Sequence, residues 1–250
     1  MDTIDLIVRS RKVLKEILSK EWNVEDINEL SPEEIRERYI SKNKSSKITF
    51  GSASNCNITL NHRKIPEHQL HIIYYNFSEI GQPPIKVTKI CCEKIISLYE
   101  DTINNNDSLL VIMQMNNISD SLLKSFELIS KDISNTIQLE DNIKEQNDKL
   151  KINEKLNPYN FKNIHILSIL DLSFNKLNHT LVPKCRIIRN QKEKDEIIKK
   201  TNSTKNQLPV QLWSDKTSQL LLSSPDDIIE YTRKTHTAGD NIYYRLCCYN

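Results

Sequence analysis

The last 72 residues, from His179 to the C-terminus, carry the most constraining pattern in the chain. Asn190 can cap a helix from about Gln191 to Lys200, which turns Ile197 and Ile198 inward. A short extended run follows at 208–212, and a second short helix starts at Asp215. Two strands then follow, the first at 228–233 and the second at 242–248. Gly239 is the residue best able to take a positive φ in the last turn. The stretch predicts a small mixed-sheet domain.

A series of short motifs in this stretch is more specific than any one of them. It consists of His179, Leu181-Val182-Pro183-Lys184, Leu208-Pro209, Thr237-Ala238-Gly239 and Tyr244-Arg245. In this order they resemble the assembly domain of the fifth subunit shared by eukaryotic nuclear RNA polymerases, which has a counterpart in archaea. The chain departs from that pattern at Cys185, where a second His is usual, at Lys216, where Pro is usual, and in lacking a Gly before the penultimate strand.

Composition limits the remaining possibilities. A chain of 250 residues is long enough for two domains. A net charge of +2 with 27% charged residues excludes a histone-like binder and a highly acidic protein, so any DNA contact is local. The six cysteines lack zinc-ligand spacing, and the sequence has no secretory signal or long apolar run. We therefore expect a reducing intracellular compartment and no membrane partner.

Ile, Asn and Lys are used far more often than Ala and Gly, which is typical of an AT-rich genome. Together with the resemblance, this usage indicates a divergent copy from a large DNA virus with its own polymerase, an AT-rich protist being the alternative. A viral protein would lie in the virion or the host cytoplasm, and a cellular one in the nucleus.

The N-terminal half predicts an α/β layer. An amphipathic helix over 3–20 is followed by a second helix to about Ile40, with Ser31 as N-cap and Glu34 completing a capping box. Extended runs follow at 47–50 and 71–77. A β-α-β unit is then predicted from a strand at 85–87, a helix from Thr88 to Tyr99 and a strand at 109–115.

This half resembles the jaw domain of the eukaryotic members, on the opening helix, Glu29-Leu30-Ser31-Pro32 and Gln114-Met115-Asn116-Asn117-Ile118. Jaw domains are similar in fold to certain nucleases. The resemblance implies an α/β (α+β) protein with a nuclease-like jaw at 1–139 and a mixed-sheet assembly domain at 164–250. Between them, 140–163 is dense in charged residues and Asn, which predicts an insertion or linker.

Catalytic patterns are mostly missing from the sequence. Its three glycines build no phosphate-cradling loop. His179 and Cys185 lack the surroundings of a thiol protease. No Asp or Glu is followed two residues later by Lys, so the lysine of a nuclease metal site is missing. His62, His68 and His71 can hold a metal only if one loop gathers them, and a polar surface loop is the favoured interpretation. We expect no catalytic residue, metal or cofactor.

Two sets of contact residues follow from the resemblance. The tip after the 109–115 strand would face downstream DNA, unless it is an ordinary strand-to-helix turn; its residues are Asn116, Asn117, Ser119, Ser121 and Lys124. A basic run at Lys42, Lys44, Lys47, Arg63 and Lys64 is a weaker candidate. The subunit interface would comprise His179, Leu181, Val182, Pro183, Leu208, Pro209, Thr237, Ala238, Gly239, Tyr244 and Arg245.

The resemblance implies a non-catalytic structural subunit of a multisubunit DNA-directed RNA polymerase. It would dock on the largest subunit, contact other subunits and support downstream duplex DNA weakly and without sequence preference during transcription. The alternative is a free-standing DNA-binding or nuclease-like factor. Purification separates the two, because a subunit purifies within a large complex and a free-standing factor purifies alone.

Overall fold

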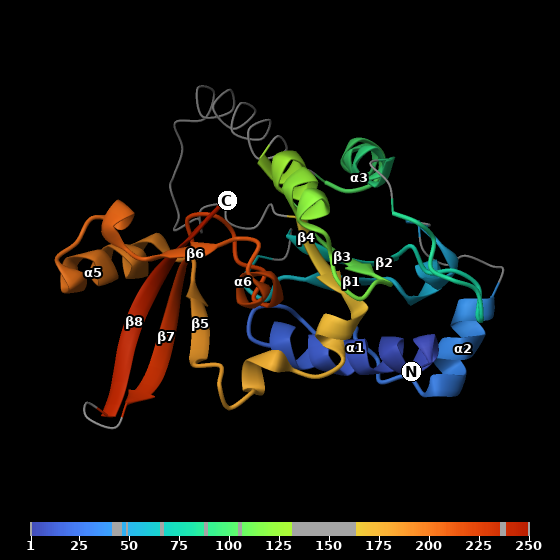
Figure 1. The fold of residues 1–250 in the computed structure, drawn as a ribbon, viewed down its shortest axis with the longest axis horizontal. Helices are drawn as coiled ribbons and strands as arrows, with labels where there is room; N and C mark the ends of the chain where they lie inside the picture. The colour runs from blue at the N-terminus through green and yellow to red at the C-terminus, as the bar shows by residue number, and fades with distance from the viewer. Residues whose placement is uncertain are drawn as a thin grey trace. The chain divides into compact units, whose positions relative to one another are not determined.

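The computed structural model describes residues 2–41, 47–48, 50–65, 68–87, 90–104, 107–131, 164–235 and 239–249. These residues form two compact units (Figure 1). The N-terminal unit comprises the described residues up to 131 together with Ile164–Asn175, and the C-terminal unit comprises those from Lys176 onward. Each unit contains a four-stranded sheet.

The sheet of the N-terminal unit has the strand order β1-β2-β3-β4. Its strands are β1 (Ile58–Asn61), β2 (Gln69–Tyr75), β3 (Ser108–Met113) and β4 (Ile164–Ser168). β1 pairs antiparallel with β2, whereas β2, β3 and β4 run parallel. All residues of β3 and β4 are buried, as expected for parallel strands covered on both faces.

Helices cover both faces of this sheet (Figure 1). α1 (Thr3–Leu18) lies on one face with η3 (Ile169–Leu172), and Ser10 Oγ lies 2.9 Å from Tyr74 OH of β2. On the other face lie α3 (Ile90–Asp101) and a helix over 120–131, which connect successive parallel strands. β2, β3 and β4 follow one another in one direction across the sheet. Right-handed crossovers between them therefore place both helices on the same face.

Local capping fixes the second helix where the sequence predicts it. α2 runs from Pro32 to Ile40, Ser31 Oγ accepts from the Glu34 N–H at 3.2 Å, and Glu34 Oε2 accepts from the Ser31 N–H at 2.7 Å. The capping box is therefore confirmed. A short 3₁₀ helix, η1 (Ser52–Cys56), packs against α2 and starts after Gly51, whose φ of 77° favours glycine.

The β-α-β unit exists, but its first strand is not the predicted one. It is β2-α3-β3, because β2 and β3 are the parallel neighbours. Residues 83–87 are irregular: two prolines without N–H groups begin the segment, and the Ile85 N–H donates to the Asn76 carbonyl. The run predicted at 47–50 is also wrong where described, since residues 47 and 48 form a bend. Thr88 lies outside the described residues.

The boundary between the units lies at Asn175–Lys176, whereas the sequence placed the start of the second domain at residue 164. The difference arises from β4, whose Ile164 and Ile166 pair with Leu109 and Val111 of β3. This apolar strand completes the N-terminal sheet. The predicted insertion at 140–163 lies outside the described residues.

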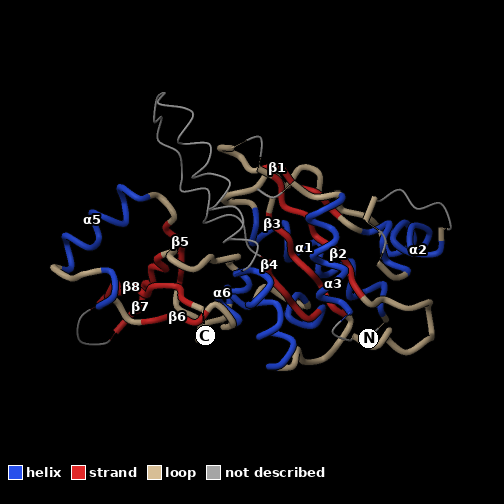
Figure 2. The backbone as a smooth tube through the Cα atoms, turned by 90° about the horizontal axis from the view of Figure 1, so that it is seen from above, coloured by secondary structure: helices blue, strands red, loops and turns tan. Residues whose placement is uncertain are grey.

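The C-terminal unit is built on a mixed sheet, as predicted, with the order β5-β7-β8-β6. Figure 2 draws these strands in red. Its strands are β5 (Lys184–Ile188), β6 (Val210–Leu212), β7 (Ile228–Thr235) and β8 (Gly239–Cys248). β6 pairs parallel with β8, and the other neighbours in this sheet pair antiparallel. The core cluster consists of Ile188, Ile197, Leu208, Ile228 and Leu246.

Short helices complete the described part of this unit: α5 (Gln191–Thr201), α6 (Lys216–Leu220), and the 3₁₀ turns η4 (Lys176–Asn178) and η5 (Lys205–Gln207). The Asn190 side chain accepts from the Lys192 N–H at 2.9 Å, which confirms the predicted cap of α5. α5 ends at Thr201 and is followed by Asn202, which has left-handed backbone angles. Ile197 is buried as predicted, while Ile198 is half-buried.

Candidate functional site

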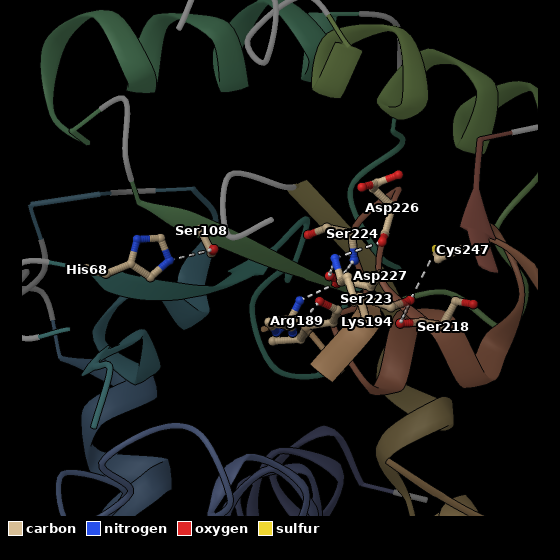
Figure 3. A network of polar contacts seen from close by, with 11 residues as sticks. His68, Ser108, Arg189, Lys194, Ser218, Ser223, Ser224, Asp226, Asp227 and Cys247 are labelled. Carbon is tan, nitrogen blue, oxygen red and sulfur yellow. Dashed lines mark hydrogen bonds and ion pairs between the residues drawn. The ribbon is translucent and has the colours of Figure 1, made fainter. Parts of the chain in front are cut away.

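A buried ionic cluster lies at the base of the C-terminal sheet (Figure 3). Arg189 Nη1 lies 2.5 Å from Asp227 Oδ2, and the two side chains are 5% and 0% exposed. Lys194 Nζ lies 3.6 Å from Asp227 Oδ1 and donates to the Asp226 carbonyl at 2.8 Å. Burial lowers the pKa of Lys194, while the Asp227 carboxylate opposes that shift.

The ionic cluster connects three segments of the C-terminal unit through ion pairs and hydrogen bonds. Arg189 follows β5, Lys194 lies in α5, and Asp227 immediately precedes β7. Asp227 Oδ2 also accepts from the Ser224 N–H at 2.8 Å, and the Asp227 carbonyl accepts from the Cys247 N–H of β8 at 2.8 Å. Since all three charged side chains are buried, the cluster organises the fold and offers no charge to a ligand.

Sequence reasoning did not identify this cluster. The available signal was Arg189 directly after the apolar Ile187-Ile188, together with the acidic pair Asp226-Asp227 in a strong turn. A charge placed within an apolar run must find a partner when it is buried. The sequence does not state which of the many carboxylates supplies it.

The first group of predicted interface residues forms a tight loop before β5. The Leu181 N–H donates to His179 Nδ1 at 3.2 Å, and the Val182 N–H donates to the His179 carbonyl at 2.9 Å. Leu181 is 85% exposed, while Val182 and Pro183 are half-buried. The loop thus holds an apolar side chain in solvent.

The second group of predicted interface residues lies on β8 of the same sheet. Tyr244 and Arg245 are half-buried on β8, and Gly239 begins that strand with a φ of 67°. Arg245 Nη1 donates to the Val210 carbonyl of β6 at 3.4 Å. Thr237 and Ala238 lie outside the described residues.

Leu208, one of the residues predicted at the interface, lies in the core of the C-terminal unit. It is 7% exposed and belongs to the core cluster, so its side chain supports folding. The neighbouring Pro209 is exposed, and its carbonyl accepts from the Leu246 N–H at 2.8 Å. The sequence motif Leu-Pro is therefore divided between the core and the surface.

The residues predicted to face DNA gather at the start of the 120–131 helix. Ser119 precedes that helix, its carbonyl accepts from the Leu122 and Leu123 N–H groups at 3.0 Å, and its hydroxyl lies 3.1 Å from the Ser121 hydroxyl. All members of the set are exposed: Asn116, Asn117, Ser119, Ser121 and Lys124. Of the weaker basic candidate, Lys47, Arg63 and Lys64 are exposed, and Lys42 and Lys44 lie outside the described residues.

The three histidines do not form the polar surface loop that the sequence favoured. His62 and His68 are buried beside Trp22, with ring centroids 5.2 and 5.5 Å from its ring. His62 Nδ1 accepts from the Lys64 and Ile65 N–H groups, while His71 Nε2 lies 3.3 Å from Asp107 Oδ2. His71 lies on β2, whereas an isolated antiparallel β-bridge pairs Trp22 with His62. This bridge brings Trp22 beside the buried His62 and His68 rings.

Two kinds of reactive group can be assessed in the described residues: metal ligands and thiols. They contain no group of three or more His, Cys, Asp or Glu side chains arranged to hold a metal. Burial raises the thiol pKa of Cys56 and Cys91 to about 11 and that of Cys247 to about 12, so these thiols stay protonated at neutral pH. Within the same described part, no helix combines the length and apolar character needed to cross a membrane.

Comparison with known proteins matches the C-terminal unit. A family model described as RNA polymerase Rpb5, C-terminal domain, matches residues 174–247. DNA-directed RNA polymerase subunit Rpo5 of Thermococcus kodakarensis is 44% identical over 73 residues, which cover 29% of this chain and 88% of the relative. Rpo5 of Archaeoglobus fulgidus is 35% identical over 75 residues, covering 30% and 97%.

Rpo5 of Nitrosopumilus maritimus is 40% identical over 68 residues, which cover 27% of this chain and 81% of that relative. These matches span most of each relative and about the length of the C-terminal unit. The family match starts at residue 174, close to the unit boundary at Asn175–Lys176. The chain belongs to the Rpb5/Rpo5 family of DNA-directed RNA polymerase subunits.

Proposed function

We propose that this chain is a non-catalytic structural subunit of a multisubunit DNA-directed RNA polymerase and docks on the largest subunit through its C-terminal unit. Family membership carries the proposal, since the relatives are named as polymerase subunits and align along most of their length with a part of this chain. The exposed Leu181 and the half-buried Tyr244 and Arg245 supply the mixture of apolar and polar groups common in interface patches.

The N-terminal unit serves as a jaw that supports downstream duplex DNA. Two features support this role: the parallel α/β layer, and the exposed polar tip from Asn116 to Lys124 beyond the carboxyl end of β3. The N-terminal end of the following helix carries a partial positive charge that favours phosphate, and the exposed Lys124 adds one positive charge. Such contacts position DNA without reading its sequence.

Crosslinking in the assembled polymerase tests the jaw. A photoreactive residue in place of Asn117 should crosslink to downstream duplex DNA in a stalled transcription complex. The same residue in place of Glu33, exposed on α2, is the control and should not. An assembled, active polymerase that gives no crosslink from position 117 would contradict a DNA-facing tip.

A free-standing DNA-binding or nuclease-like factor is the alternative. Incubation of the chain with magnesium or manganese and with linear, nicked or branched DNA should give no cleavage, because the sequence lacks the carboxylate-x-lysine motif. A labelled duplex should bind weakly and without sequence preference, since a net charge of +2 releases few counterions. Cleavage that disappears when one carboxylate is replaced, or tight sequence-selective binding, would favour the alternative.

The source and location proposed from composition are a large DNA virus and its virion or host cytoplasm. The AT-rich residue usage supports a viral or protist genome. Peptide mass spectrometry of purified virions, compared with nuclear extract, tests the location. Peptides found only in nuclei would favour a cellular protein.

A further inference from the structure

β8 is much longer than the strand beside it. It runs from Gly239 to Cys248, but β6 pairs only with its last part, Val210 with Leu246 through Leu212 with Cys248. Among the residues that the structure describes, no strand lies along residues 239–245 on that side. Figure 1 shows β7 and β8 as long red strands beside the short β6. Within the described part of the chain, the hairpin therefore presents an open sheet edge.

The hydrogen bonds at the base of β8 show which backbone groups face this edge. The Leu246 N–H donates to the Pro209 carbonyl and the Cys248 carbonyl accepts from the Trp213 N–H, so even-numbered residues point toward the β6 side. The Cys247 N–H donates to the Asp227 carbonyl, so odd-numbered residues point toward β7. Because backbone groups alternate along a strand, Asp240, Ile242 and Tyr244 direct their N–H and C=O groups outward.

We infer that this open edge of β8 accepts an extended segment of another polymerase subunit as an added strand, with Asp240, Ile242 and Tyr244 as its backbone partners. The inference rests on the proposed function, which supplies the class of partner. Outward N–H and C=O groups repeating every second residue match only another extended polypeptide. The side chains beside this edge suit a protein segment better than DNA, since Ile242 is an apolar residue that is 47% exposed and Tyr244 packs on the core.

The opposite edge of the sheet is less suited to strand addition. β5 carries the exposed Lys184 and Arg186, and charged side chains on an edge strand discourage pairing with another chain. Arg186 is also held in place, because Nε lies 2.7 Å from Glu230 and Nη1 lies 2.7 Å from Glu193. The open part of β8 extends over more residues than the whole of β5.

Two variants at one position separate backbone pairing from side-chain contact. Ile242→Pro removes the outward N–H and leaves the bonds to β7 in place, which an edge strand tolerates. Ile242→Thr keeps the N–H and a β-branched side chain. Each is co-expressed with the largest polymerase subunit. We expect Ile242→Pro to weaken capture at least about tenfold, and Ile242→Thr to change it little. Equal capture of both variants would overturn strand addition.

Residue-resolved hydrogen exchange gives the answer even if Ile242→Pro fails to fold. In the wild-type complex with the largest subunit, the Ile242 and Tyr244 amides should exchange at least about tenfold more slowly than in the free chain. Tyr243, bonded toward β7, should be protected in both. Assembly with unprotected Ile242 and Tyr244 amides overturns this inference alone, whereas failure to assemble overturns the proposed function. Protection of these amides in a dimer of the isolated chain would also overturn it, by assigning the edge to a second copy.

Discussion

The Arg189 guanidinium lies 2.5 Å from the Asp227 carboxylate, and both side chains are almost completely buried. Lys194 adds a second buried cation beside the same carboxylate. One anion therefore serves two cations in the part of the chain that matches the Rpb5 family. Replacement of the anion and replacement of one cation should therefore have opposite effects on the free energy of unfolding.

Asp227→Asn should destabilise the chain by about 3–5 kcal/mol, because it leaves two buried cations without their anion. Urea unfolding followed by circular dichroism measures the change. Asp226→Asn is the matched control: Asp226 pairs with Lys205, both side chains are more than a third exposed, and the loss should stay below about 1 kcal/mol. Similar losses in both variants would show that the buried position of Asp227 has no special role.

Lys194→Met should be neutral or stabilising by about 1–2 kcal/mol near neutral pH, since burial makes the Lys194 charge costly and Arg189 still neutralises Asp227. In the folded wild-type chain the pKa of Lys194 lies below its ordinary value of 10.5. Between these two pKa values, the unfolded chain therefore binds more protons than the folded chain. The Lys194 contribution to stability therefore rises with pH in that window. The stability difference between variant and wild type should shrink as the pH approaches 10.5. A difference that grows would contradict this assignment.

Gly51→Ala should cost about 3 kcal/mol or more, because a Cβ there would lie 2.6 Å from the Phe77 carbonyl oxygen and the backbone has a φ of +77°. Gly239→Ala should cost only about 1–2 kcal/mol, since its φ is +67° but nothing beyond its chain neighbours lies within 4 Å of the added Cβ. Thermal unfolding of the two variants gives the comparison. Equal losses would show that φ alone, and not the close approach of Phe77, sets the cost.

Arg245→Ala should leave the isolated chain folded with nearly unchanged Tm, because the hydrogen bond that its guanidinium donates to the Val210 carbonyl is long, at 3.4 Å. Incorporation into the polymerase should weaken by about 2 kcal/mol, roughly thirtyfold, if the guanidinium binds a partner. Lys199→Ala, exposed on α5, is the control and should change neither quantity. A variant that melts early but assembles normally would make Arg245 a structural residue.

Elements with local signals were predictable from the sequence. Ser31 and Asn190 cap their helices with contacts only two or three residues away, and both caps are present. Gly239 starts β8 with a positive φ, as its place in the turn predicts. The order of motifs in the C-terminal unit also predicted its mixed sheet, because those motifs are specific in combination.

Features that depend on distant partners were not predictable. β4 pairs in parallel with β3, and Ser168 of β4 donates to the carbonyl of Met115, which follows β3 and lies 53 residues earlier in the sequence. Its membership of the N-terminal sheet therefore has no local signal. Arg189 and Asp227 are 38 residues apart. Leu208 stands in a surface motif, yet the core formed by Ile188, Ile228 and Leu246 encloses it. Each outcome is decided by tertiary packing.

Affinity purification of the tagged chain from its natural source, followed by mass spectrometry, tests the central claim most directly. The largest subunit and the other subunits of one DNA-directed RNA polymerase should copurify in equal amounts with the tagged chain, at a salt concentration that removes DNA. Recovery of the chain alone, as a monomer free of polymerase subunits, would contradict the account.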